Sequence, residues 1–138
     1  MRYLVFMSVV VAVAFWAMGC SGDRDPGPSA RDSYEAAMAS GKPVLLDFGA
    51  DGCPTCVQMK PFVYKAISDY RGELEVVMID TNVDRDLASQ YRVRAIPTYV
   101  FIKPGGETVS RAMGFIEASD FDSKIRQFID DHPPAEIN

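Results

Sequence analysis

The chain has 138 residues, of which 48% are apolar and 24% charged; these proportions are those of one globular domain and exclude a disordered chain. The net charge of −5 argues against nucleic acid as a partner, because phosphate backbones bind basic proteins. Three cysteines are too few for a disulfide-stapled scaffold, so their positions carry more information than their number.

The first segment, residues 1–19, is predicted to be a signal peptide. Arg2 gives a short positive start, and residues 4–18 form an uncharged apolar run that is short for a membrane-spanning helix. The run is followed by Gly19 and Cys20, which resemble the end of a bacterial lipoprotein signal, where the cysteine becomes the lipidated N-terminus. An uncleaved membrane anchor and a secretory signal cut elsewhere are the alternatives. All three place the domain outside the cytoplasm.

Residues 20–32 are rich in Gly, Pro and polar side chains, which is typical of a flexible tether. If Cys20 carries lipid, this tether holds the domain off the membrane. The sequence from Asp32 to Glu35 resembles a capping box and predicts a short helix to about Ser40, closed by Gly41. We therefore predict a globular domain over residues 33–138.

A buried strand followed directly by two cysteines is the most informative stretch. Residues 44–48 are an apolar run, and two glycines then allow a sharp turn before Cys53-Pro54-Thr55-Cys56. The pattern after these residues is helical, so the cysteines lie where a strand ends and a helix begins. The first turn of a helix presents unpaired N–H groups that favour a thiolate, so a cysteine there has a lowered pKa. Pro54 suits the first helical position, where its missing N–H costs nothing.

The remaining elements alternate regularly. We predict a helix from Pro54 to Gly72, a strand over 74–79, a helix over 84–91, a strand over 98–103, a hairpin turn at 104–107, a strand over 108–113 and a last helix capped by residues 119–122 and ended by His132. The helix between the first two strands makes those strands parallel, and the hairpin makes the last two antiparallel.

Five landmarks in this order and spacing resemble the thioredoxin family over about residues 42–131. They are Asp47-Phe48-x-Ala50, the Cys-x-x-Cys motif, Pro61 five residues after it, Ile96-Pro97-Thr98, and the later glycines Gly105, Gly106 and Gly114. The resemblance implies an α/β thioredoxin fold, with a central mixed sheet of about four strands flanked by helices. It also implies that no cofactor is needed beyond the two cysteines.

The same resemblance implies that Cys53 and Cys56 form a redox disulfide. Cys53 would attack a client disulfide, and Cys56 would resolve the resulting mixed disulfide. If Cys20 carries lipid, no odd thiol is left over. A structural disulfide and a zinc site are the alternatives. Zinc normally takes four ligands, whereas the only histidine, His132, lies far along the chain, so we predict no metal.

Asp47 is a single carboxylate within the apolar strand, and burial there would raise its pKa. The resemblance implies that Asp47 lies beneath Cys56 and takes its proton. A solvated strand residue is the alternative, because alternation along the strand does not say which way the side chain points. The lysine that accompanies this aspartate in the family falls at Val76, so that charge partner is absent.

Ile96 and Pro97 are predicted to form the second half of the site. By the resemblance, a cis bond before Pro97 would expose the backbone of Ile96 for pairing with an extended client segment. The alternative is an ordinary trans proline at the start of a strand. Gly114 would line the same groove, and Pro54 is expected to contact substrate beside Cys53.

We therefore predict a monomeric, extracytoplasmic thiol–disulfide oxidoreductase, anchored through lipid on Cys20. Its partners would be client proteins with disulfides and a membrane electron donor, because a reductase outside the cytoplasm needs an electron source. Ile96 before the proline, and similarity to thioredoxin rather than to oxidases with an inserted helical domain, favour reduction. The alternatives are a disulfide-donating oxidase of the same fold and a non-catalytic peptide-binding module. Both intact cysteines argue against the module.

Overall fold

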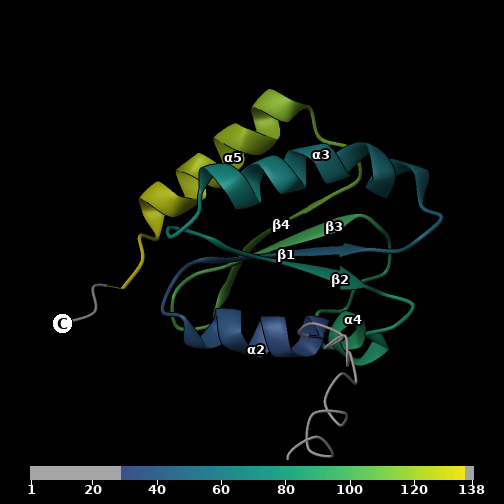
Figure 1. Ribbon diagram of the computed structural model, residues 1–138, viewed down its shortest axis with the longest axis horizontal. Coiled ribbons are helices and arrows are strands. Elements are labelled where there is room, and N and C mark those ends of the chain that lie inside the picture. The colour runs from purple at the N-terminus through teal and green to yellow at the C-terminus, as the bar shows by residue number, and fades with distance from the viewer. Residues whose placement is uncertain (1–28, 136–138) are drawn as a thin grey trace, which may run out of the picture.

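The structure is a computed structural model that describes residues 29–135; the predicted signal peptide, Cys20 and the tether up to residue 28 lie outside the described residues. A central sheet is covered by α3 and α5 on one face and by α2 and α4 on the other (Figure 1). The elements are α2 (Ala30–Ala39), β1 (Val44–Gly49), α3 (Pro54–Asp69), β2 (Glu75–Asp80), α4 (Arg85–Gln90), β3 (Thr98–Ile102), β4 (Thr108–Met113) and α5 (Ala118–Asp131). No helix in this part of the chain is both long enough and apolar enough to cross a membrane.

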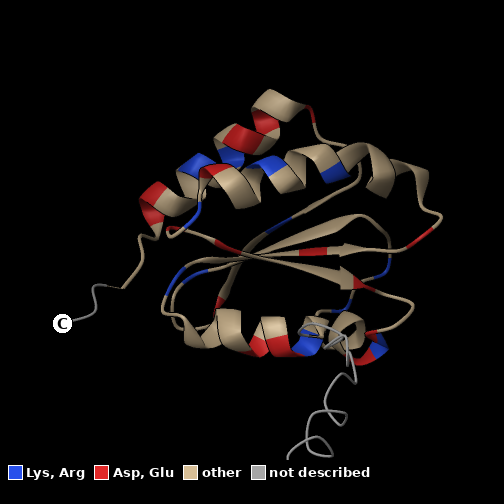
Figure 2. Cartoon of the chain, viewed as in Figure 1, with Lys and Arg blue, Asp and Glu red and all other residues tan. Residues whose placement is uncertain are grey.

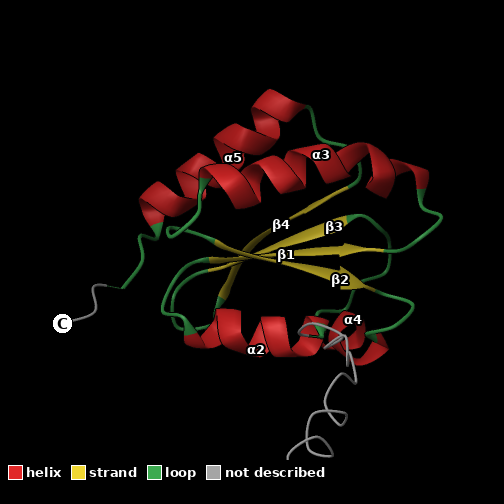
Figure 3. Ribbon diagram, in the orientation of Figure 1, coloured by secondary structure: helices red, strands yellow, loops and turns green. Residues whose placement is uncertain are grey.

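The four strands lie in the order β2-β1-β3-β4. β1 is parallel to β2 and antiparallel to β3, and β4 is antiparallel to β3. The parallel pair is joined by the α3 crossover, as parallel strands require, and the yellow strands are enclosed between red helices (Figure 3). The predicted mixed sheet flanked by helices, and with it the thioredoxin fold, is therefore confirmed.

The side chains of β1 alternate between two apolar cores. Val44, Leu46 and Phe48 pack toward α2 and α4, whereas Leu45 packs toward α3 and α5. Asp47 has the same parity as Leu45, so its carboxyl points to the α3/α5 side. Charged residues lie mostly on helices and loops, and the strands are largely tan (Figure 2). A carboxylate in the middle of β1 is therefore an exception that needs a reason.

Two helix starts differ from the sequence prediction. The N-cap of α2 is Ser29, whose hydroxyl accepts from the Asp32 backbone N–H at 3.1 Å while the Asp32 carboxylate accepts from the Ser29 N–H at 3.1 Å. Asp32 is thus the third residue of the helix and not its cap, and residues 30–32 belong to α2 rather than to the tether. The predicted cap at Ser119 is also wrong, because the Glu117 carbonyl already accepts from the Phe121 N–H at 2.9 Å and starts α5 earlier.

Candidate active site

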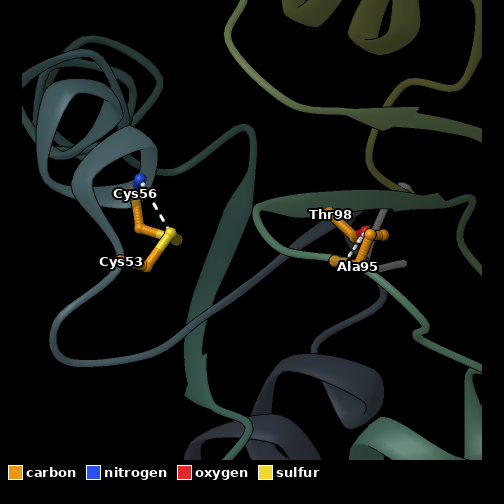
Figure 4. The surroundings of a disulfide bond; sticks show 4 residues. All are labelled: Cys53, Cys56, Ala95 and Thr98. Carbon is orange, nitrogen blue, oxygen red and sulfur yellow. Dashed lines mark hydrogen bonds between the residues drawn. A yellow bond between two sulfur atoms is a disulfide. The ribbon is translucent and has the colours of Figure 1, made fainter.

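Cys53 and Cys56 lie at the start of α3 and form a disulfide, as predicted, with their Cα atoms 5.3 Å apart (Figure 4). Cys53 is the N-cap residue, and its sulfur accepts a hydrogen bond from the Cys56 backbone N–H at 3.2 Å. In the reduced protein this N–H and the positive end of the helix would favour a thiolate on Cys53. The predicted lowering of the Cys53 pKa by the helix start can therefore be traced to one hydrogen-bond donor, the Cys56 backbone N–H.

The two cysteines differ in exposure. Cys53 is half-buried, whereas Cys56 is only 8% exposed. Pro54, the first residue of α3, is exposed beside Cys53. On the inner side the end of β1 lies against Cys56, because a Cβ atom on Gly49 would stand 3.5 Å from the Cys56 sulfur. Cys53 is therefore the sulfur that a client can reach.

The Ile96–Pro97 turn lies at the same edge of the sheet as the disulfide. Phe48 pairs with Thr98, so Pro97 comes beside the end of β1 that contacts Cys56. The peptide bond before Pro97 is cis, as the resemblance implied. The Thr98 hydroxyl donates to the Ala95 carbonyl at 2.7 Å, which closes the turn (Figure 4). The fold thus brings together two segments that are far apart in the sequence.

Gly114 is placed next to this turn, where its N–H donates to the Pro97 carbonyl at 2.9 Å. Ile96 is half-buried, and within residues 29–135 its backbone N–H and C=O make no backbone hydrogen bond. Two free main-chain groups on a fixed turn can pair with an extended chain, as strands do at a sheet edge. The predicted groove residues are therefore adjacent to one another.

Asp47 is buried, with 8% of its surface exposed, so the alternative of a solvated strand residue is wrong. Burial raises the pKa of Asp47 from 3.8 to about 6, and the Lys60 ammonium group partly opposes this rise. Directly across on β3 stands Tyr99, whose buried hydroxyl has no hydrogen-bond partner in the described part of the chain. Burial first, and the Asp47 charge second, raise the pKa of Tyr99.

Asp47 and Cys56 line one cavity of about 170 Å³ beside the end of β1. Lys60 also lines it, and sequence reasoning missed this residue. A usable signal was present, since Lys60 follows Cys56 by one helical turn and so lies on the same face of α3. The other residues of the lining are Gly49, Ala50, Asp51, Met78, Ile79 and Asp80. The cavity thus joins the buried carboxyl to the inner sulfur.

No group of three His, Cys, Asp or Glu residues within 29–135 is arranged to hold a metal ion. The His132 ring packs on Phe128 of α5, with centroids 5.5 Å apart.

Comparison with known proteins agrees with the fold and with the disulfide at the helix start. The sequence model of the thioredoxin family, described as "Thioredoxin", matches residues 27–127. A thioredoxin-like protein of Synechocystis sp. is 35% identical over 95 residues, which cover 69% of this chain and 90% of that protein. A thioredoxin of the same organism is 33% identical over 95 residues, covering 69% and 88%. The chain belongs to the thioredoxin family.

Solved structures show the same fold at lower identity. The germline thioredoxin Deadhead of Drosophila melanogaster superposes with a TM-score of 0.64 at 24% identity, covering 72% of this chain and 93% of that one. Chloroplastic thioredoxin z gives a TM-score of 0.63 at 24% identity, covering 73% and 90%. Membership of the family, together with the intact cysteine pair, makes this protein a thiol–disulfide oxidoreductase that acts on protein disulfides.

Proposed function

We propose that this protein is a lipid-anchored, extracytoplasmic reductase of protein disulfides. Its location is supported by the apolar run before Gly19-Cys20, which resembles a lipoprotein signal. In this proposal it acts as a monomer, since a single chain supplies both cysteines and the cis-proline turn. Its electrons come from a donor in the membrane, because the cytoplasmic reducing systems do not reach that compartment.

The observation that carries the reductive direction is the acidic cavity under Cys56. A strong disulfide oxidant is one whose reduced form is stabilised. Here the cavity is lined by three carboxylates, those of Asp47, Asp51 and Asp80, and by one cation, Lys60. An excess of negative charge beside Cys56 opposes ionisation of its thiol, so the reduced form does not gain at Cys56 the thiolate stabilisation that makes a strong oxidant. A dithiol that is readily oxidised is a reductant.

The proposed reaction transfers two electrons from the dithiol to a client disulfide. The Cys53 thiolate attacks one client sulfur, a mixed disulfide forms, and the other client sulfur leaves as a thiolate. Asp47 then takes the proton of the Cys56 thiol. The Cys56 thiolate attacks the Cys53 sulfur, closes the internal disulfide and releases the second client thiolate. Client binding is assigned to the free backbone of Ile96, to which an extended client segment pairs.

The direction is tested by equilibrating the Cys53–Cys56 couple with glutathione buffers and measuring its potential. We expect a value close to the roughly −270 mV of thioredoxin. A value near the roughly −120 mV of a strong oxidant would instead support the disulfide-donating alternative.

The roles of the two sulfurs are tested by trapping. Cys56→Ser is expected to accumulate mixed disulfides with client proteins, because Cys53 can attack but nothing resolves the product. Cys53→Ser is the matched control and is expected to trap none, since Cys56 is only 8% exposed. Equal trapping by both variants would refute these roles. Trapping by neither, with clients still bound noncovalently, would favour the peptide-binding module.

The anchor is tested separately from the chemistry. In a bacterial host, the full chain is expected to incorporate labelled fatty acid, and Cys20→Ala is expected to lose both the label and signal processing. Ser21→Ala, one residue further on, is the control and is expected to keep both. Fatty-acid label that persists in Cys20→Ala would refute the lipoprotein proposal, and it would not bear on the proposed redox chemistry.

A further inference from the structure

The proposed reaction assigns no role to Lys60, yet this side chain lines the cavity that also holds Asp47 and Cys56. It lies one turn after Cys56 on α3 and is half-buried. Within the described residues, no other Lys or Arg contributes to this lining. The side chain is therefore placed to act on the carboxyl under the inner sulfur.

We propose that Lys60 is a positioning residue for thiol–disulfide exchange, whose ammonium group keeps the buried Asp47 in its carboxylate form, ready to accept the Cys56 proton. The proposal rests on the proposed role of Asp47 as the base. It assigns to α3 a cation that the thioredoxin family carries at the position of Val76 on β2, where this chain has an apolar side chain that packs against the core.

The other groups around Asp47 cannot supply this effect. From β3, Tyr99 presents a neutral ring and a phenol that burial keeps protonated. From β2, the cross-strand partner is Met78, which carries no charge. Asp51 and Asp80, which line the same cavity, are acidic side chains and supply no cation. Lys60 is the one group among these that favours the ionised form.

The proposed reaction needs both burial, which raises the pKa of Asp47, and Lys60, which lowers it, because Asp47 must be ionised before it can accept a proton. Burial alone would hold much of the Asp47 carboxyl protonated near neutral pH, and a protonated carboxyl is no base. The cation counteracts burial without removing it. The pKa of Asp47 stays close to 6, so the group is ionised at pH 7 and is still basic enough to take a thiol proton. The cavity then gives the proton a path to solvent.

The test is an NMR pH titration of the Asp47 carboxyl carbon in the oxidised protein, which requires no client and no turnover. Lys60→Gln is expected to move the midpoint upward by about one pH unit, and Lys60→Arg to restore it. Lys65→Gln is the matched control, an exposed lysine on the same helix that pairs with Asp69, and is expected to leave the midpoint unchanged. An unchanged midpoint in Lys60→Gln, or an equal rise in Lys65→Gln, would overturn the proposal.

A kinetic measurement shows whether the effect of Lys60 on Asp47 changes the rate of thiol–disulfide exchange. Mixed-disulfide decay is measured against pH with a small model disulfide in wild type, Lys60→Gln and Lys60→Arg. With the midpoint one unit higher, the ionised fraction of Asp47 falls, so Lys60→Gln is expected to decay about five-fold more slowly at pH 6 and about two-fold more slowly at pH 7. The difference is expected to vanish near pH 9. A shifted titration with an unshifted decay profile would overturn the role of Lys60 in exchange. If Asp47→Asn also decays at the wild-type rate, the failure lies in the proposed base instead.

Discussion

The two faces of the sheet treat buried polar groups in opposite ways. On the α2/α4 face, the Tyr91 hydroxyl lies 2.9 Å from the Tyr34 hydroxyl, so both are hydrogen-bonded. On the α3/α5 face, Asp47 and Tyr99 stand opposite each other on neighbouring strands, and the Tyr99 hydroxyl has no partner among residues 29–135. One face is a satisfied core, and the other retains polar groups that raise the free energy of the folded state.

The face with the unsatisfied polar groups is the one on which the disulfide lies. The cavity that reaches Cys56 opens on the side that carries Asp47, whereas Phe48, the next residue of β1, packs among apolar side chains on the other side. In the proposed reaction Asp47 is the base for Cys56, and this role requires an ionisable group at a position where burial is costly. On the α2/α4 face the buried side chains form an apolar cluster, and the Tyr34 and Tyr91 hydroxyls bond each other.

The largest effect is expected from the satisfied face. Phe48 is fully buried, and Phe48→Ala is expected to lower the free energy of unfolding by about 3–5 kcal/mol through lost burial and a residual cavity. Urea unfolding of the oxidised protein at pH 5 and pH 8 measures this loss. The loss is expected to be equal at the two pH values, because no titrating group is removed. A loss that depends on pH would break the proposed separation of the two faces.

Asp47→Asn is expected to raise the free energy of unfolding, in contrast to Phe48→Ala, and to do so in a pH-dependent way. The folded-state pKa of Asp47 is about 6, above the unfolded value of 3.8, so its stabilising contribution is complete below pH 4 and is lost as pH rises through 6. The variant is therefore expected to be more stable than wild type at pH 8, by up to about 3 kcal/mol, with the advantage gone at pH 4. Urea unfolding across this range measures it.

The same variant is expected to resolve mixed disulfides slowly near neutral pH and faster as pH rises, because Cys56 then ionises without a base. The attack by Cys53 is expected to be nearly unchanged, since the start of α3 favours its thiolate. A wild-type decay rate across neutral pH would show that Asp47 is not the base.

Tyr91→Phe tests the satisfied hydroxyl pair. Removing this hydroxyl takes a hydrogen bond from Tyr34, which still accepts from the Gln90 amide at 3.1 Å. We expect a loss of about 1 kcal/mol in the free energy of unfolding, measured by urea at pH 7. No loss would mean that the tyrosine pair contributes nothing to the stability of this face.

Tyr99→Phe is the matched change on the other face, and it has the smallest expected effect with the opposite sign. It removes a buried hydroxyl that lacks a partner, so the free energy of unfolding is expected to rise by about 1 kcal/mol or less. The same urea series measures it. A destabilised Tyr99→Phe would show that this hydroxyl is satisfied in solution, and the contrast between the faces would shrink.

The sequence by itself determined the family, the cysteine pair and most element boundaries. These follow from local signals: an apolar run that ends in glycine, Cys-x-x-Cys at a helix start, and a hairpin turn between two strands. The failures were also local. Ser29 and Asp32 both fit a helix cap, and only the hydrogen bonds of the folded helix select Ser29.

Tertiary structure alone decided how the site is assembled. Alternation along β1 fixes that Asp47 and Leu45 share a face, but only the packing of α3 over that face places the carboxyl under Cys56. The register of β1 with β3 sets Asp47 opposite Tyr99 and brings Pro97 beside the end of β1. The sequence places Lys60 one helical turn after Cys56, but its position beside Asp47 follows from where α3 crosses the sheet. These relations join residues distant in sequence, so their energies arise from pairing and packing that no local pattern encodes.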